Sequence, residues 1–263
     1  MTTIVFGNQK GGPGKTTLAV LYAHWLVDRK HQRVCFIDLD SQRNASKTLR
    51  TYGCNVTASA LFGPMVELPD VAAAPLVLLP GSADLVDLER ASPQAVIPAF
   101  RQHVGALEQR FDACVIDTPP ALGLRLSAAL IAARHVACPI ELEEYSIDGV
   151  TDMLRTIFGV RQKYNPGLQL LGLVANRFNP HSLRQKEALQ DLLASYADFL
   201  VPARISTRSA IPEALAAGVP VWRLAKTSAR EASAEVFAAF EALHARIDHH
   251  ADREVAWHST SAT

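Results

Sequence analysis

Residues 7–17 of the chain read Gly7-Asn8-Gln9-Lys10-Gly11-Gly12-Pro13-Gly14-Lys15-Thr16-Thr17, and this stretch decides the fold. It follows a short apolar run and opens a helical pattern. Glycines let the backbone curl so tightly that several N–H groups point into one hollow, where they can bind phosphate oxygens. The positive end of the following helix adds to this anion site. A turn of purely structural origin would not need Gly14-Lys15-Thr16 at this spacing, so the stretch predicts a triphosphate-binding loop.

Outward from this loop, short apolar runs alternate with longer amphipathic ones, which is the pattern of βαβ units around a parallel sheet. The expected strands are Thr3–Gly7, Arg33–Leu39, Leu76–Leu79, Ala113–Asp117, His135–Ile140 and Leu168–Ala175. The expected helices are Lys15–Asp28, Pro93–Gln109, Leu122–Ala133, Ile147–Lys163, Ser182–Tyr196, Ser209–Ala217 and Ser228–Ile247. We therefore expect an α/β, doubly wound fold with a mainly parallel sheet flanked by helices. It forms a single domain over residues 1–247, followed by a polar, flexible tail over residues 248–263.

The composition is that of a globular protein with a large core. Of the 263 residues, 49% are hydrophobic and 20% are charged. No apolar window is long enough to cross a membrane, and no basic segment precedes the first apolar run, so we expect a cytoplasmic protein. The four cysteines form no C-x-x-C pair, which indicates reduced thiols and not a metal cluster or a disulfide.

Carboxylates follow two of the expected strands. Asp38 and Asp40 end the second one, and their i, i+2 spacing places both on the same side. Asp117 ends the apolar run Ala113–Asp117. Because the carboxyl ends of parallel strands meet at one edge of the sheet, we expect these groups beside the phosphates. Asp117 would hold Mg²⁺ directly or through water, and the Thr16 hydroxyl would complete the metal shell. Lys15 would place its ammonium on the β- and γ-phosphates.

Lys10 makes the loop unusual. The run Lys-Gly-Gly-x-Gly-Lys-Thr-Thr resembles the deviant Walker A motif of the ParA/MinD family of P-loop ATPases, and the resemblance extends from about Thr3 to about Ile247. It implies a homodimer that forms with ATP, in which Lys10 reaches the phosphates bound by the other subunit. The alternative is an ordinary solvent-exposed lysine ahead of the loop.

The resemblance also assigns roles in the site. Residues 38–46 resemble the family's Asp-x-Asp-Pro-Gln-x-Asn segment, which implies that Asp40 positions or polarises the attacking water while Asp38 lies nearer the Mg²⁺. Ser41 replaces the usual proline and Arg43 the usual glycine, which changes the loop but keeps both carboxylates. Asn176 is the candidate to read the adenine edge, and the alternative for it is a capping or turn role. The expected nucleotide-binding residues are Lys10, Gly11, Gly12, Pro13, Gly14, Lys15, Thr16, Thr17 and Asn176, with Lys10, Lys15 and Asp40 catalytic.

Within the family, the chain is most similar to the ParA-type partitioning ATPases. These imply nonspecific DNA binding, association with the nucleoid and a ParB-like partner protein that stimulates hydrolysis. The expected strand at Thr3 leaves no room for an N-terminal helix-turn-helix domain, and residues 248–257 lack the apolar face of a membrane anchor. Cations outnumber acidic residues between Arg177 and Arg230, which favours phosphate-backbone contacts. The candidate DNA contacts are Arg184, Lys186, Arg204, Arg208, Arg223, Lys226 and Arg230. The alternative function is a MinD-like or cargo-positioning regulator that acts on a protein or membrane platform.

Overall fold

A single sheet organises the chain. The computed structural model describes the backbone of residues 1–68, 74–142 and 146–260, and the side chains of these residues except 146, 147 and 249–260. Within these ranges, every strand pairs in parallel, in the order β3-β2-β4-β1-β5-β6-β7. The strands are β1 (Thr2–Phe6), β2 (Val34–Asp38), β3 (Leu76–Leu79), β4 (Ala113–Asp117), β5 (His135–Glu141), β6 (Gln169–Phe178) and β7 (Leu200–Ser206). The doubly wound, parallel α/β fold expected from the sequence is confirmed.

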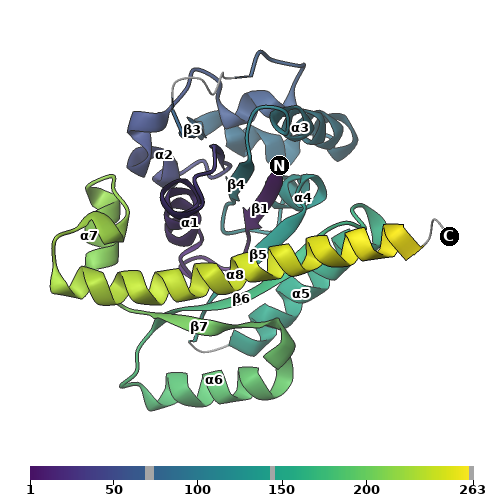
Figure 1. Cartoon of the computed structure of the whole chain (residues 1–263). Coiled ribbons are helices and arrows are strands. Elements are labelled where there is room, and N and C mark those ends of the chain that lie inside the picture. Colours follow the sequence, from purple (N-terminus) through teal and green to yellow (C-terminus); the bar gives the residue numbers. More distant parts are fainter. Residues whose placement is uncertain (69–73, 143–145, 261–263) are drawn as a thin grey trace.

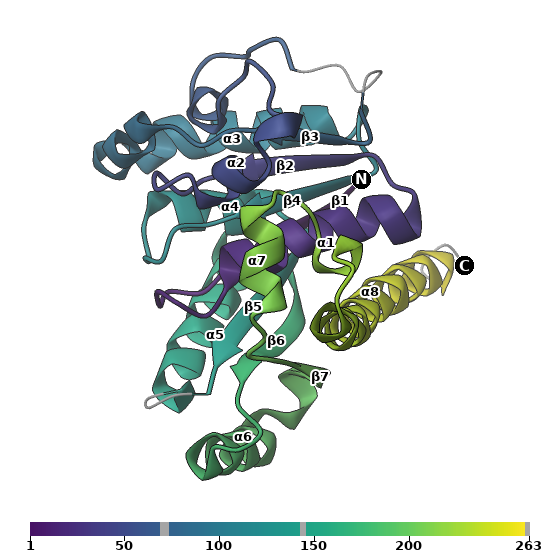
Figure 2. The ribbon, with the colours of Figure 1, turned by 90° about the vertical axis from the view of Figure 1, so that its left-hand side faces the viewer.

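Helices connect the strands and cover both faces of the sheet (Figures 1 and 2). The α-helices are α1 (Lys15–Lys30), α2 (Asn44–Thr48), α3 (Pro93–Leu107), α4 (Leu124–Ala132), α5 (Ser146–Lys163), α6 (Leu183–Tyr196), α7 (Ala210–Ala216) and α8 (Thr227–Thr260). Short 3₁₀ helices are η1 (Arg50–Tyr52), η2 (Ala58–Phe62), η3 (Ala83–Arg90), η4 (Ala197–Phe199) and η5 (Val221–Arg223).

Two apolar cores lie on opposite faces of the sheet, because successive side chains of a strand point to opposite sides. In β2, Cys35 and Ile37 belong to the core under α3, α4, α5 and α6, whereas Val34 and Phe36 belong to the core under α1, α7 and α8. Every residue of β2 is buried, as expected for a strand that is covered on both faces. The three layers are visible in Figure 2.

The central strands place their carboxyl ends side by side. β1 lies between β4 and β5 in the sheet. The direction in which the chain adds strands to the sheet reverses at β1. Asp38 at the end of β2 is directly opposite Asp117 at the end of β4, and Phe6 of β1 is also opposite Asp117. The loop at residues 7–14 leaves β1 at this edge. Such a switch point is where open α/β sheets bind ligands.

The structure differs from the sequence prediction at α2, β7 and α8, and α2 was not among the expected helices. β7 was not among the expected strands, but it pairs with β6 and forms an edge of the sheet. α8 was expected to end at Ile247 and continues to Thr260, so most of the segment predicted as a tail is helical. Residues 261–263 lie outside the described residues. No helix in the described part of the chain is both long and apolar enough to span a membrane.

Candidate phosphate and metal site

The loop between β1 and α1 is held from both sides by asparagine side chains. Asn8 donates its amide to the carbonyl of Pro139 on β5 at 2.7 Å, and Asn176 on β6 donates to the carbonyl of Pro13 at 2.8 Å. Both asparagines are buried. Asn176 therefore takes the supporting role in this structure, while its contact with adenine stays a prediction. Asn8 was not among the expected functional residues, although its place in the loop, two residues after β1, is a signal for such a role.

Gly14 has no room for a side chain. Its φ is +88°, in the left-handed region, and a Cβ there would lie 2.2 Å from the amide nitrogen of Asn176. Gly12, at φ +95°, also lies in the left-handed region. The glycines are therefore required by backbone conformation as well as by the close approach of β6.

Lys15 is the cation of the site and begins α1. Lys15 is only 6% exposed, and its ammonium donates a hydrogen bond to the carbonyl of Lys10 at 2.9 Å. Burial lowers the pKa of Lys15, while the negative charges of Asp117 and Asp40 oppose that shift. The structure thus brings together the predicted phosphate-binding lysine and two of the predicted carboxylates.

Asp38 organises the segment that follows β2. One oxygen accepts hydrogen bonds from the N–H and the hydroxyl of Ser46, at 2.9 and 2.6 Å, and the other accepts from the N–H of Asp40 at 3.0 Å. Asp40 in turn accepts from the N–H of Gln42. Burial raises the pKa of Asp38, and the bonds from Ser46 and Asp40 counteract the rise. The metal role of Asp38 stays a prediction, since in this structure its oxygens hold the loop.

Asp117 fits a metal better. It is fully buried, and neither of its oxygens has a partner with hydrogen-bond geometry among the described residues. Its burial and the neighbouring charge of Asp38 raise its pKa, whereas the nearby hydroxyl of Thr16 and the charge of Lys15 lower it. Such an orphaned buried carboxylate needs a cationic partner.

The donor set matches magnesium. The described residues contain no group of three or more His, Cys, Asp or Glu side chains that could hold a metal by themselves. Magnesium retains several waters and takes one or two carboxylates plus substrate phosphates, so it does not need such a cage. Thr16 and Asp117 supply the oxygens that this mode of binding requires.

Lys10 lies across the start of α5 in its own subunit. A Cβ at Gly149 would lie 2.7 Å from the Lys10 ammonium. The N–H of Lys10 donates to the side-chain oxygen of Asn8 at 3.0 Å, which fixes its backbone, and the residue is exposed. The absence of a side chain at Gly149 thus makes room for Lys10 on the surface.

Arg43 stands at the position where the resemblance leads us to expect glycine, and its φ is +58°. The backbone therefore keeps the left-handed turn that glycine would adopt without strain, at a cost of about 1–2 kcal/mol for a residue with a Cβ. Arg43 therefore makes this turn strained.

The predicted DNA contacts do not form one set. Arg208 pairs with Glu231 and Glu235, Arg223 with Asp28, and Lys226 with Glu213. Arg204 lies in β7, which was not among the expected strands, and its guanidinium is 4.9 Å from the ring centroid of Phe178. Lys186 on α6 and Arg230 on α8 are exposed, as is Arg184 on α6, and neither Lys186 nor Arg230 has an ion pair in the described structure.

Comparison with known proteins agrees with this geometry. A sequence model of the family described as "AAA domain" matches residues 1–170. The chain is 44% identical over 246 residues to Protein IncC of Escherichia coli, a match that covers 90% of this chain and 67% of that protein. It is 32% identical over 228 residues to the chromosome-partitioning ATPase Soj of Thermus thermophilus, covering 86% of this chain and 89% of Soj. The chain belongs to the ParA/MinD-type partitioning ATPases.

The structural comparison adds a nucleotide-bound relative. Cobyrinic acid a,c-diamide synthase of Mycobacterium smegmatis, solved with an ATP analogue and magnesium, superposes with a TM-score of 0.73 at 26% identity. The superposition covers 95% of each chain. The present chain and the cobyrinic acid synthase therefore share the same arrangement of sheet and helices over nearly their full lengths.

Proposed function

We propose that this chain binds MgATP as a ParA-type ATPase and hydrolyses it within an ATP-dependent homodimer. The observation that carries the proposal is the convergence of Lys15, Asp40 and the orphaned Asp117 at the end of β1. Family membership supports the choice of ATP, and the nucleotide and metal bound by the cobyrinic acid synthase support Mg²⁺.

The residues divide the work as follows. The backbone N–H groups of residues 11–17 hold the phosphates, and Lys15 leaves the carbonyl of Lys10 to bind them. Thr16 and Asp117 hold the Mg²⁺, which when bound neutralises charge on the phosphates. Asp40 orients and polarises the attacking water. Lys10 leaves its place over Gly149 and reaches the phosphates of the second subunit.

The wider role is transport of a cargo over DNA. In the proposal the ATP-bound dimer binds DNA without sequence preference and stays with the nucleoid. A ParB-like partner protein stimulates ATP hydrolysis and so releases the dimer from DNA. Repeated binding and release partition or position a plasmid, a chromosome or another cargo. Of the seven candidate cations, Arg208, Arg223 and Lys226 already hold carboxylates, and we assign the phosphate contacts to Lys186, Arg230 and Arg204, which form no ion pair among the described residues.

Those same ion pairs favour a second candidate. With three of the seven expected cations engaged, the chain could act as a MinD-like or cargo-positioning regulator on a protein or membrane platform. Binding of a labelled duplex at 50 and 200 mM salt, with ATP and with ADP, distinguishes the two. The DNA proposal expects ATP-dependent binding that falls steeply with salt, by a slope of about 0.9 in log K per phosphate contact. No binding at low salt supports the platform.

Hydrolysis itself is tested by phosphate release from MgATP. The proposal expects slow turnover by the wild-type chain and none by Asp40→Ala. A wild-type chain that binds ATP and never releases phosphate would contradict the enzymatic part of the proposal.

A further inference from the structure

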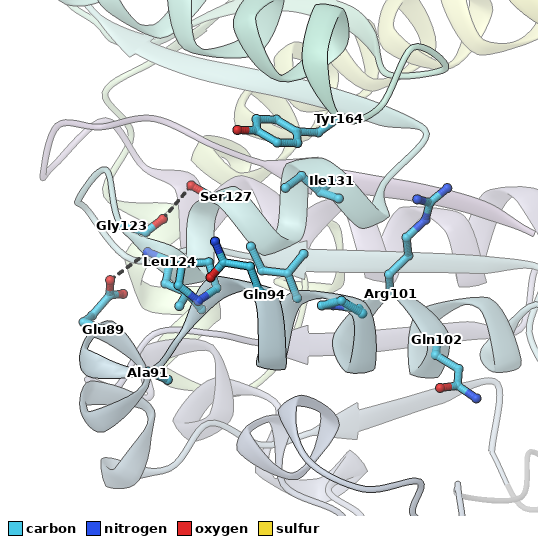
Figure 3. Close-up of a pocket in the computed structure, with 13 residues that line it drawn as sticks. Glu89, Ala91, Gln94, Arg101, Gln102, Gly123, Leu124, Ser127, Ile131 and Tyr164 are labelled. Carbon is cyan, nitrogen blue, oxygen red and sulfur yellow. Dashed lines mark hydrogen bonds between the residues drawn. The ribbon is translucent and has the colours of Figure 1, made fainter.

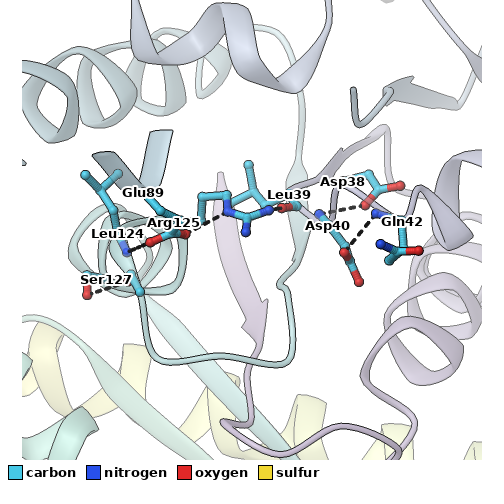
Figure 4. A network of polar contacts seen from close by, with 9 residues as sticks. Asp38, Leu39, Asp40, Gln42, Glu89, Leu124, Arg125 and Ser127 are labelled. Carbon is cyan, nitrogen blue, oxygen red and sulfur yellow. Dashed lines mark hydrogen bonds and ion pairs between the residues drawn. The ribbon is translucent and has the colours of Figure 1, made fainter. Parts of the chain in front are cut away.

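A buried arginine outside the phosphate loop donates a hydrogen bond to the backbone next to Asp40. Arg125, in the first turn of α4, donates from a terminal nitrogen to the carbonyl of Leu39 at 3.0 Å (Figure 4). Its side chain is only 8% exposed. It is the one charged residue in the apolar helix predicted at Leu122–Ala133, which is a sequence signal for a buried partner.

The bond reaches Asp40 through a single rigid unit. The Leu39 carbonyl and the Asp40 N–H belong to the same planar peptide. Arg125 holds the oxygen of that peptide, and the Asp38 carboxylate accepts its N–H at 3.0 Å. The N–H of Leu39 donates to the carbonyl of Asp117, also at 3.0 Å. Loss of Arg125 therefore removes one of three bonds that fix where Asp40 begins.

Glu89 fixes Arg125 in turn. One oxygen of Glu89 accepts from the Arg125 side chain at 2.8 Å, and the other accepts from the Leu124 N–H at 2.7 Å. Burial raises the pKa of Glu89, but the bonds from Arg125 and Leu124 outweigh it and hold that pKa below its ordinary value. The carboxylate thus caps the start of α4 and aligns the guanidinium at the same time.

Glu89 also reaches the protein surface. It lines a hollow of about 1040 Å³ between α3 and α4, together with Gln94, Ile97, Leu124 and Ile131 (Figure 3). The Glu89 side chain is 33% exposed there. A substitution at Glu89 can therefore loosen Arg125 without touching any residue that would contact the nucleotide.

We propose that Arg125, aligned by Glu89, is a positioning residue that sets the place of Asp40 for hydrolysis. The inference rests on the proposed role of Asp40. Nucleotide affinity depends on the loop and on Lys15, which the pair does not contact, whereas turnover depends on where Asp40 holds the water. A misplacement of about 1 Å in such a group can lower a rate by about 100-fold.

The test compares Arg125→Gln, Glu89→Gln and the double variant with the wild type. Turnover is measured per ATP-binding site counted by calorimetry, so that unfolded protein does not enter the rate, and thermal unfolding is followed in parallel. We expect Arg125→Gln to lower kcat by about 10- to 100-fold with ATP affinity within about threefold of wild type. Glu89→Gln should give a smaller loss. The double variant should lose no more than Arg125→Gln alone, because both act through one bond.

The matched control is Arg33→Gln. Arg33 also forms a close ion pair, with Asp112 at 2.8 Å, but at the opposite end of the strands, and its variant should keep the wild-type kcat. If Arg125→Gln does not fold, Glu89→Gln carries the test alone. Unchanged kcat in both variants, additive losses, or a loss of affinity in place of kcat would overturn the proposal. A wild type that never turns over ATP would instead contradict the proposed function itself.

Discussion

The Lys15 ammonium lies 2.9 Å from the carbonyl of Lys10, so one lysine of the loop holds the backbone of the other. A bound phosphate chain would compete for the same ammonium. If Lys15 binds the phosphates as proposed, nucleotide binding would free the Lys10 carbonyl and would couple the phosphate site to the segment that carries Lys10.

Substitution of Lys15 should remove tight ATP binding. A hydrogen bond to a charged group contributes about 1.5–3 kcal/mol, and Lys15 would make more than one to the phosphates, so Lys15→Gln should weaken binding by at least about 100-fold. Isothermal titration with MgATP measures this. The control is Lys30→Gln, at the other end of α1, where the ammonium pairs with Glu241. Equal affinity in Lys15→Gln and Lys30→Gln would mean that the loop does not bind the nucleotide as described.

Gly14→Ala should disable the loop through its backbone. The new Cβ would lie 2.2 Å from the Asn176 amide, and φ would remain at +88°. We expect a loss of about 1–3 kcal/mol in the free energy of unfolding together with loss of ATP binding. Gly105→Ala on α3 is the control, because nothing lies within 4 Å of a Cβ there. That variant should be neutral or more stable by up to about 1 kcal/mol. A Gly14→Ala protein as stable as Gly105→Ala would contradict the packing at Asn176.

Acid should destabilise the fold in part through His24. This residue of α1 is 2% exposed, its ring packs edge-on against Tyr52, and its Nε2 has no hydrogen-bond partner in the described structure. Burial lowers the pKa of His24 to about 4; the nearby Asp28 raises it and Arg223 lowers it. Between pH 6.5 and 4, His24 binds a proton in the unfolded chain but stays neutral in the folded chain. The free energy of unfolding therefore falls as pH falls, by up to about 3 kcal/mol.

Urea unfolding at pH 7 and pH 4.5 measures this effect. His24→Phe cannot take up a proton at residue 24, so its loss of stability over this pH range should be smaller than that of the wild type. An equal loss in both proteins would assign the acid sensitivity to other groups.

The sequence predicted the sheet and the meeting of the carboxylates because both follow from local patterns. Asp38 and Asp117 each end a fully apolar run, and parallel strands bring such ends to one edge. β7 escaped prediction for a physical reason. It is an edge strand whose Pro202 and Arg204 are exposed, so its residues do not form the apolar run of a covered strand.

Contacts between side chains far apart in the sequence could not be predicted from the sequence. The engagement of Arg208 by Glu231 and Glu235 depends on how α8 lies along β7, and no spacing in the sequence encodes it. The same holds for the hydrogen bond from Arg125 to the carbonyl of Leu39, because these two residues are 86 positions apart. Asn176 was noticed, but only the fold shows that its amide holds Pro13.

The central claim is that ATP holds two subunits together, that Lys10 completes the site of the other subunit, and that hydrolysis through Asp40 separates them. Light scattering with MgATP tests this claim most directly. Asp40→Ala should bind ATP, double in mass and remain a dimer, because it cannot hydrolyse the nucleotide that holds the subunits together. Asp40→Ala combined with Lys10→Ala should bind ATP and stay a monomer. A stable dimer of the combined variant would return Lys10 to the role of a solvent-exposed lysine, and a monomeric Asp40→Ala saturated with MgATP would contradict the account.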